Sequence, residues 1–333
     1  MSNESSESNG IETQSDRFRR TNLTMKNIPL LAAALAVSAA SALSAAETLR
    51  AFQSESAVDI WVGDQFFTSY RYNTGEKLPY FFPVNGPSGA SVTSVRNPQF
   101  PHHASLWFGC DRVNGGNYWQ DTMEHGRILS ERLVLEGAAR GTSADLPNMS
   151  GLEVVISQTC VWRRAGAPEP FRDTRRYVIT APSAALRVID AAITLEALTD
   201  VEILKTNHSF FSLRADPAFA VSAGGRMVNA EGLAGEQATF GKGSPWMAFH
   251  GRRAGGVEEG IALFQHPGNP WYPAPWFTRD YGFLSPTPMY WPQDGAATKI
   301  KQGEQLMLRY RTVVFAGDPK SARLGELFEA YAK

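Results

Sequence analysis

Hydrophobic positions along the chain recur in short runs rich in β-branched residues, and polar turn residues interrupt them. The runs span 154–161, 175–180, 186–195, 201–204, 210–213, 260–264 and 306–315. Turn pairs such as Pro182-Ser183, Thr199-Asp200 and Gly224-Gly225 separate them. Short strands about ten residues apart, with few helical patterns between them, are typical of an antiparallel sandwich or barrel. The pattern predicts a single all-β domain over residues 47–333, a large antiparallel β-sandwich.

One helix is predicted, at the C-terminus. Asp318 is suited to cap it and Pro319 to occupy its first position. Apolar residues then follow at helical spacing, namely Leu324, Leu327, Phe328 and Tyr331. We expect this helix to close one end of the sandwich.

Residues 1–46 differ in composition from the rest and are expected to lie outside the domain. Residues 1–24 are polar, whereas residues 28–46 are small and apolar. The apolar run follows Lys26 and ends in Ser44-Ala45-Ala46, which has the small-x-small pattern of a signal-peptidase cleavage site. This predicts an N-terminal extension with a signal peptide, and therefore a periplasmic or secreted protein. Arg19-Arg20 resembles a twin-arginine export signal. A retained membrane anchor is the alternative, because the apolar run approaches spanning length.

Net charge and cysteine content limit which binding partners and metal sites are expected. The net charge is −1, which argues against a nucleic-acid groove and against an anionic membrane surface. After the signal segment, no stretch is apolar and long enough to span a bilayer. Cys110 and Cys160 could pair in an exported chain or remain free, and without a CxxC unit they do not favour a zinc–thiolate site.

The richest chemistry lies in FPHHASLWFGCDRVNGGNYW, residues 100–119, which holds two of the six histidines. Imidazoles supply proton transfer or metal ligation near neutral pH, and indole rings offer flat apolar faces. We interpret the stretch as a loop that forms a site for a polyhydroxylated ligand; a polar surface loop is the alternative. The candidate residues are His102 and His103 for catalysis and Trp107, Asp111, Arg112, Asn117 and Trp119 for substrate binding.

Two further clusters contain candidate residues. TNHSFFSL, residues 206–213, presents His208, although a lone histidine on a strand is often structural. The Pro-rich and aromatic stretch 266–291 predicts either a cleft wall or a surface loop. Its candidate residues are His266, Trp276 and Arg279 for binding and Asp280 for catalysis.

The segment TNHSFFSL resembles the Asn-His-(Ser/Thr)-Tyr-Phe-Asn-Leu strand of aldose 1-epimerases, the galactose mutarotases. Lys301-Gln302-Gly303-Glu304 and the strand after it resemble that family's Pro-Gly-Glu turn and last strand. The resemblance implies a galactose mutarotase-like supersandwich, with His208 as a general acid towards the sugar ring oxygen. The family's catalytic glutamate has no counterpart in Phe283-Leu284-Ser285-Pro286, and only Asp280 is near. The chain therefore has no counterpart of the catalytic base that simple mutarotation requires.

Over its mature length the chain resembles an exported bacterial family that often carries the automatic label "methane oxygenase PmoA". The resemblance rests on KLPYFFPVNGPSG at 77–89, PHHASLWF at 101–108 and NPWYP at 269–273. A membrane methane monooxygenase subunit needs several apolar helices of about 20 residues, and no such segment follows the signal. The resemblance thus implies a family, and the label's activity is not expected.

Three classes of function follow. The first is an enzyme acting on a sugar or oxidised sugar as an epimerase, lyase or ring-opening catalyst, with His208 and His103 or His102 as acid and base. The second is a non-catalytic carbohydrate-binding sandwich. The third is a metal-dependent enzyme using His102 or His103, Asp111 and His125 or His208. Adjacent histidines on a strand point to opposite faces, which disfavours the third class and places one imidazole in the cleft. No cofactor or metal is predicted, and the expected partner is a small carbohydrate.

Overall fold

The computed structural model describes residues 45–73, 75–120, 122–136, 140–141, 148–292, 295 and 297–333. The predicted N-terminal extension and signal peptide lie almost entirely outside these residues and stay a prediction. Within the described part of the chain, no helix has both the length and the apolar character needed to cross a membrane.

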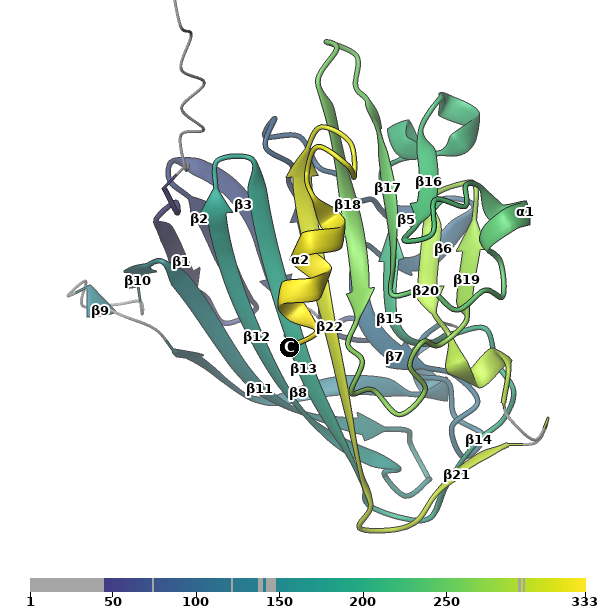
Figure 1. The fold of residues 1–333 in the computed structure, drawn as a ribbon. Coiled ribbons are helices and arrows are strands. Elements are labelled where there is room, and N and C mark those ends of the chain that lie inside the picture. The colour runs from purple at the N-terminus through teal and green to yellow at the C-terminus, as the bar shows by residue number, and fades with distance from the viewer. Residues whose placement is uncertain are drawn as a thin grey trace, which may run out of the picture. The chain divides into compact units, whose positions relative to one another are not determined.

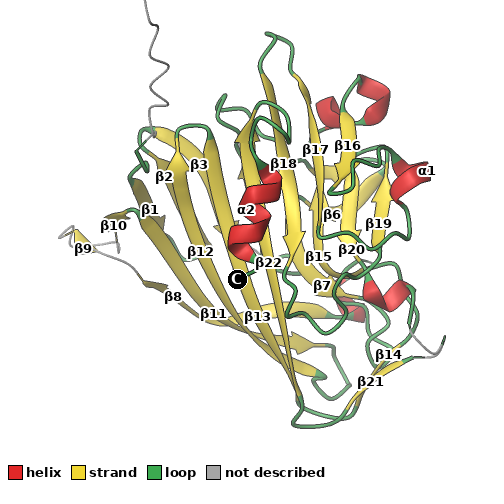
Figure 2. Ribbon diagram, in the orientation of Figure 1, coloured by secondary structure: helices red, strands yellow, loops and turns green. Residues whose placement is uncertain are grey.

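Two antiparallel sheets face each other across the core (Figures 1 and 2). The first runs in the order β19-β20-β15-β7-β4-β3-β2-β1-β10-β9. Its strands are β1 (Leu49–Gln53), β2 (Ala57–Val62), β3 (Gln65–Arg71), β4 (Tyr80–Val84), β7 (Leu106–Cys110), β9 (Arg140–Gly141), β10 (Asn148–Gly151), β15 (Ser209–Arg214), β19 (Trp276–Arg279) and β20 (Phe283–Pro286).

The second sheet runs in the order β16-β17-β18-β22-β13-β12-β11-β8. Its strands are β8 (Arg127–Glu136), β11 (Glu153–Arg163), β12 (Phe171–Ser183), β13 (Leu186–Ala197), β16 (Arg226–Asn229), β17 (Trp246–Arg252), β18 (Glu258–Gln265) and β22 (Gln305–Ala316). Two short ribbons complete the fold, β5 (Val95–Asn97) with β6 (Phe100–Ala104) and β14 (Val201–Ile203) with β21 (Thr298–Ile300).

Alternation of side chains explains why these segments form a sandwich. Along β12, Phe171, Tyr177 and Ile179 are buried and their neighbours are more exposed, as expected for a strand with one face on the core. The same inward face also carries Asp173 and Arg175, which pair at 2.7 Å inside the core. The prediction of an antiparallel all-β sandwich is confirmed, and each predicted apolar run falls on a strand.

The prediction of a loop over residues 100–119 is wrong in its first half. Residues 100–104 form β6, and all five residues of β7 are buried. β7 is a central strand, since it pairs with β15 on one side and β4 on the other. The apolar sequence LWFGC suits that position, and the polar residues that suggested a loop begin only at Asp111.

The C-terminal helix is present but begins later than predicted. Helix α2 spans Leu324–Tyr331, because the Ser321 N–H donates to Asp318 Oδ1 at 2.7 Å and closes a turn there. Arg323 then adopts a left-handed φ of 54° just before the helix. The apolar side of α2 packs on Trp246, Phe264 and their neighbours on β17, β18 and β22. The helix therefore covers the outer face of the second sheet rather than closing an end (Figure 2).

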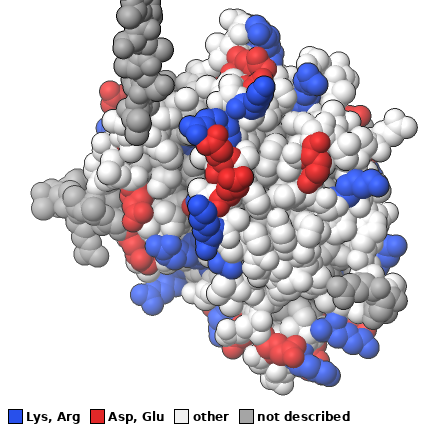
Figure 3. All heavy atoms as spheres, in the orientation of Figure 1, with Lys and Arg blue, Asp and Glu red and all other residues white. Residues whose placement is uncertain are grey.

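Other helical segments are short. They are α1 (Glu236–Thr239) and the 3-10 turns Met123–His125, Pro217–Phe219, Val221–Ala223 and Pro288–Tyr290. On the face that carries α2, basic and acidic side chains lie intermixed, with broad uncharged areas between them (Figure 3).

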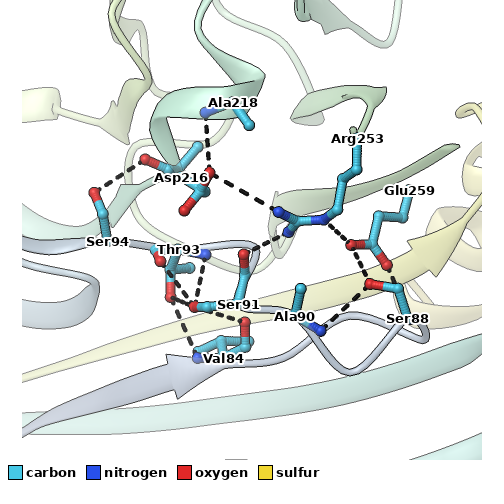
Figure 4. A network of polar contacts seen from close by, with 11 residues as sticks. Val84, Ser88, Ala90, Ser91, Thr93, Ser94, Asp216, Ala218, Arg253 and Glu259 are labelled. Carbon is cyan, nitrogen blue, oxygen red and sulfur yellow. Dashed lines mark hydrogen bonds and ion pairs between the residues drawn. The ribbon is translucent and has the colours of Figure 1, made fainter. Parts of the chain in front are cut away.

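A buried ionic network joins the loop after β4 to the second sheet (Figure 4). Glu259 on β18 is 0% exposed and accepts hydrogen bonds from the Ser88 N–H at 3.1 Å and the Ser88 hydroxyl at 2.8 Å. Arg253, in the turn between β17 and β18, pairs with Glu259 and donates to the Ser91 carbonyl. Its guanidinium thus links two segments that are distant in sequence.

The same network reaches the junction of β6 and β7. The Ser91 hydroxyl donates to the Thr93 carbonyl at 2.8 Å, and the Ser105 hydroxyl donates to Thr93 Oγ1 at 2.8 Å. Ser105 is the residue between β6 and β7, and its φ is 68°. The network therefore helps to hold the strand that carries His102 and His103.

Candidate functional site

His208 and Asp111 form a pair at the ends of two neighbouring strands. Asp111 follows β7 and His208 precedes β15, and antiparallel pairing of Ser209 with Cys110 brings both ends together. His208 Nδ1 lies 3.1 Å from Asp111 Oδ2, and Asp111 is only 4% exposed. A hydrogen on Nδ1 that is donated to this carboxylate oxygen would fix the ring in its observed orientation. Asp111 therefore orients the ring and leaves Nε2 available for a ligand.

Trp119 forms a platform beneath this pair. Its ring stacks on His208 with centroids 4.5 Å apart, and its Nε1–H donates to Ser212 Oγ at 3.3 Å. The Trp119 backbone N–H donates to Asn117 Oδ1 at 3.1 Å. Asn117 therefore positions the platform through a turn, and it is not part of the pocket walls described below.

His102 and His103 both belong to the same site. Their ring centroids are 4.7 Å apart, and both lie within 6 Å of Trp119, at 5.5 and 5.8 Å. His102 is 6.1 Å from His208. The expectation that the two imidazoles occupy opposite faces is wrong. They lie on β6, which forms an irregular two-stranded ribbon with β5, and two-stranded ribbons twist more than wide sheets.

Burial keeps both histidines neutral at physiological pH. Burial, together with the nearby His208, lowers the pKa of His102 to about 4. Burial lowers the pKa of His103 to about 2, with smaller contributions from His102 and Arg214. His103 is 3% exposed, whereas His102 is half-buried. A neutral, accessible imidazole is able to accept a proton, so His102 suits a base and His103 suits the wall behind it.

Two adjoining hollows meet at these residues. The first, which we call the histidine pocket, is about 220 Å³ in volume. The second, the outer pocket, is about 600 Å³ and shares His102, His103 and Trp119 with the first. The histidine pocket is further lined by Phe100, Gln120, Asn207, His208, Phe277, Arg279, Tyr281 and Phe283.

The outer pocket contains polar residues that sequence reasoning missed. The Tyr80 hydroxyl donates to Glu76 Oε1 at 2.9 Å, and Arg96 forms an ion pair with Glu76. All three residues line the pocket. Tyr80 begins β4, Glu76 lies just before that strand and Arg96 lies on β5, so no single sequence motif contains all three.

Arg279 reaches the histidine pocket, whereas Asp280 does not. Arg279 Nη1 pairs with Glu236 Oε1 at 2.9 Å, and its guanidinium lies 4.1 Å from the centre of the Phe277 ring. Asp280 Oδ1 instead accepts the Glu236 N–H at 2.8 Å at the start of α1. Its position gives no support to a catalytic role and assigns it to holding α1.

Two of the predicted stacking residues are buried in the core. Trp107 is 1% exposed and lies behind His103, with ring centroids 5.7 Å apart. Trp276 is 0% exposed and its Nε1–H donates to the Ser244 carbonyl at 2.8 Å. Neither lines a pocket with the histidines, so the structure places both in packing roles.

Arg112 and His266 also lie outside the two pockets. Arg112 is exposed, and its Nη1 donates to the Lys205 carbonyl at 3.0 Å. His266 lies beside α2, 5.1 Å from the ring of Tyr331. The predicted binding residues that the structure brings together with the histidines are therefore Asp111, Trp119 and Arg279.

The cysteines are free thiols on opposite sheets. Cys110 lies on β7 and Cys160 on β11, and both are buried. Within the described ranges, no group of three or more His, Cys, Asp or Glu side chains is arranged to hold a metal ion. The metal-dependent hypothesis therefore finds no ligand set in that part of the chain.

Comparison with known proteins places the chain in a family. A family model described as a family of unknown function, DUF6807, matches residues 57–329. The chain belongs to this family. Its description names no activity and does not carry the methane oxygenase label. No curated protein matches the chain.

Several solved structures are distantly similar. A candidate aldose 1-epimerase from Klebsiella pneumoniae has 10% identity and a TM-score of 0.38, over 83% of this chain and 84% of that one. An α-galactosidase from Lactobacillus brevis has 9% identity and a TM-score of 0.34, over 80% of this chain. A candidate kojibiose phosphorylase from the human microbiome has 9% identity and a TM-score of 0.33, over 84% of this chain. This chain spans 39% and 33% of the length of the last two.

Proposed function

We propose that the protein acts on a sugar or an oxidised sugar by acid–base chemistry in the histidine pocket. His208 is the proton donor and His102 the proton acceptor. The observation that carries this proposal is the geometry of three groups. A buried Asp111 orients His208 at 3.1 Å, and the His208 ring lies 6.1 Å from a neutral His102 in the same pocket.

The proposed chemistry divides between the two histidines. Asp111 holds the ring of His208 in place, and His208 donates a proton from Nε2 to a sugar oxygen. His102 is neutral above a pKa of about 4 and accepts a proton from a hydroxyl or a carbon beside a carbonyl. A donor and an acceptor on one ligand are what epimerisation, ring opening and β-elimination require. The proposal covers these three reaction types.

The walls of the pocket suit a polyhydroxylated ligand. Phe100 and Tyr281, which are both partly exposed, offer aromatic surface for the apolar face of a sugar ring. Asn207 and Gln120 offer amide groups that donate and accept hydrogen bonds to hydroxyls. A non-catalytic sugar-binding protein would use the same walls, so turnover decides between the two functions.

The test follows proton exchange at carbon and anomer interconversion by ¹H NMR in D₂O, with a panel of neutral and oxidised sugars. We expect the wild-type protein to accelerate one of these processes. His208→Gln should lower the rate by roughly 10²- to 10⁴-fold, the usual contribution of one acid–base group. Sugar affinity should change far less. Asp111→Asn should also lower the rate, because Asp111 orients His208.

His266→Gln is the matched control, since it removes a histidine that lies outside both pockets. Its rate should equal that of the wild type. Binding without turnover across the whole panel would instead establish the non-catalytic function. An unchanged rate in His208→Gln would remove His208 from the mechanism.

Export is proposed as well, on the sequence of residues 1–46 alone. It predicts that cells expressing the full chain release a shortened protein into the periplasm or medium. Mass spectrometry of the N-terminus tests this, and an intact N-terminus on a protein kept in the cytoplasm would contradict it.

A further inference from the structure

The outer pocket continues the histidine pocket past His102. The two hollows share three wall residues, and two of these are almost fully buried, His103 at 3% exposure and Trp119 at 1%. His102 is half-buried, so its ring is the accessible side chain at the boundary. A ligand bound between His208 and His102 is therefore able to extend past His102 into the outer pocket.

The volumes of the two pockets suit a ligand of more than one sugar unit. Sites for small molecules usually measure about 300–1,000 Å³. The histidine pocket, at about 220 Å³, lies below that range and suits one sugar ring, whereas the outer pocket, at about 600 Å³, lies within it. A monosaccharide that reacts beside His208 would leave the larger hollow unused.

Two charged side chains of the outer pocket are suited to bind hydroxyl groups. Arg96 forms an ion pair with Glu76, yet 53% of the Arg96 side chain and 22% of the Glu76 side chain are exposed. A guanidinium has five N–H donors and a carboxylate has about four acceptor sites, so both groups keep hydrogen-bonding capacity for a ligand. Hydrogen bonds to charged groups are stronger than those between neutral groups.

The remaining charged residue in the described lining of this pocket is Lys77. Its Nζ donates to the Thr122 and Gly126 carbonyls, both at 2.8 Å, and so ties the 3-10 turn Met123–His125 to the wall. Met123 lies in that turn, lines the pocket and is 45% exposed. An exposed apolar side chain beside hydrogen-bonding groups suits a sugar ring, whose faces are apolar and whose edge carries hydroxyls.

We propose that the substrate is a disaccharide or a longer sugar, with its reacting unit in the histidine pocket and a second sugar unit in the outer pocket. This rests on the proposed function, because it assigns the substrate class of the same site. Arg96 and Glu76 bind hydroxyls of the second unit, and Met123 contacts its ring. These residues therefore determine specificity for the second unit and do not touch the reacting one.

The test compares dissociation constants by calorimetry for glucose and galactose with those for sophorose, laminaribiose, cellobiose, gentiobiose and lactose. Wild-type protein should bind at least one disaccharide roughly 10- to 100-fold tighter than its component monosaccharides, as expected for an added hydrogen bond to a charged group. Arg96→Asn removes the guanidinium and suits the left-handed φ of 51° at this position, which asparagine tolerates. It should lower the affinity for that disaccharide by about 10-fold and leave monosaccharide binding unchanged.

Arg323→Asn is the matched control. Arg323 also has a left-handed φ, of 54°, and pairs with Glu326, but it lines neither pocket. This variant should bind every sugar as the wild type does. Met123→Ala provides the test if Arg96→Asn does not fold, and it too should weaken only the disaccharide. Its own control is Met307→Ala, since Met307 is 54% exposed and lines neither pocket.

Monosaccharides that bind as tightly as every disaccharide would overturn this assignment and leave the proposed function intact. Wild-type affinity for the disaccharide in both Arg96→Asn and Met123→Ala would overturn it as well, because the second unit would then lie elsewhere. Tighter binding of phenyl β-glucoside than of every disaccharide would assign the outer pocket to an apolar group instead of a sugar. Failure of every sugar to bind would remove both proposals together.

Discussion

The ionic network in Figure 4 provides a quantitative test of how the two sheets are joined. Replacing Arg253 by Met keeps most of the side-chain volume and removes the guanidinium from Glu259 and from the Ser91 carbonyl. Glu259 is 0% exposed and would then keep only the two hydrogen bonds from Ser88, at 3.1 and 2.8 Å. A buried carboxylate would be left without its cation.

The expected cost follows from that burial. Removing one partner of a buried ion pair destabilises a protein by about 3–5 kcal/mol, since the remaining charge is uncompensated. Ser88 still solvates Glu259, so we expect Arg253→Met to lower the free energy of unfolding by about 3 kcal/mol. Glu259→Gln in the Arg253→Met background should restore part of this loss, because the uncompensated charge is then gone.

Urea unfolding followed by tryptophan fluorescence measures the free energy, and equal m-values would show that the folded and unfolded states are comparable. Lys301→Met is the control, because Lys301 also forms an ion pair, with Asp200 at 3.0 Å, but both side chains are exposed. Its stability should match the wild type. If Arg253→Met is no less stable than Lys301→Met, the network does not hold the loop and the reasoning fails.

Three further predictions follow from burial. Since the pKa of His103 is lowered from its usual 6.5 to about 2, the unfolded chain binds a proton in that window that the folded chain does not. The contribution of His103 to the free energy of unfolding should therefore be fully present above the pKa of the unfolded chain. It should be lost on acidification by about 1.4 kcal/mol per pH unit. Urea unfolding at several pH values should show a smaller slope for His103→Phe than for the wild type. The pKa of His102 is about 4, so a rate that depends on neutral His102 should stay constant from neutral pH down to about pH 4 and fall below it. A decrease in rate near pH 6.5, with the titration assigned to His102 by NMR of its ring protons, would contradict this. Burial raises the pKa of both cysteine thiols, so Cys110 and Cys160 should resist a thiol reagent in the folded protein and react after unfolding; a disulfide found by mass spectrometry would refute the free-thiol assignment.

Local sequence predicted seven strands, namely β11 to β15, β18 and β22, and failed where position in the sheet decided the outcome. The run 186–195 is recognisable as a strand because alternate residues face the core along β13. β7 was misread, since a strand buried on both faces lacks that alternation and its polar neighbours suggested a loop. The C-terminal helix was predicted five residues too long at its start, because the turn at Asp318 competes with capping.

The candidate site likewise contains residues that the sequence reveals and residues that it does not. His102, His103 and His208 are visible in sequence because histidine is scarce in this chain and these residues stand in unusual motifs. Glu76 is not visible, as nothing near it in the sequence distinguishes it from an ordinary surface charge. Its contacts with Tyr80 and Arg96 in the outer pocket are properties of the folded chain.

By itself, then, the sequence determined the all-β class, seven of the strands and the histidines to which we assign the proposed chemistry. Periodicity and composition report on these, because each depends on neighbours a few residues away. Only the tertiary structure decided that Asp111 meets His208 from 97 positions away, and that Glu259 meets Ser88 from 171 positions away. Such contacts depend on sheet order and register, which place residues of distant segments side by side through burial of both sheets against one core. The physical character of the pocket, with neutral histidines among aromatic rings, arises from that burial.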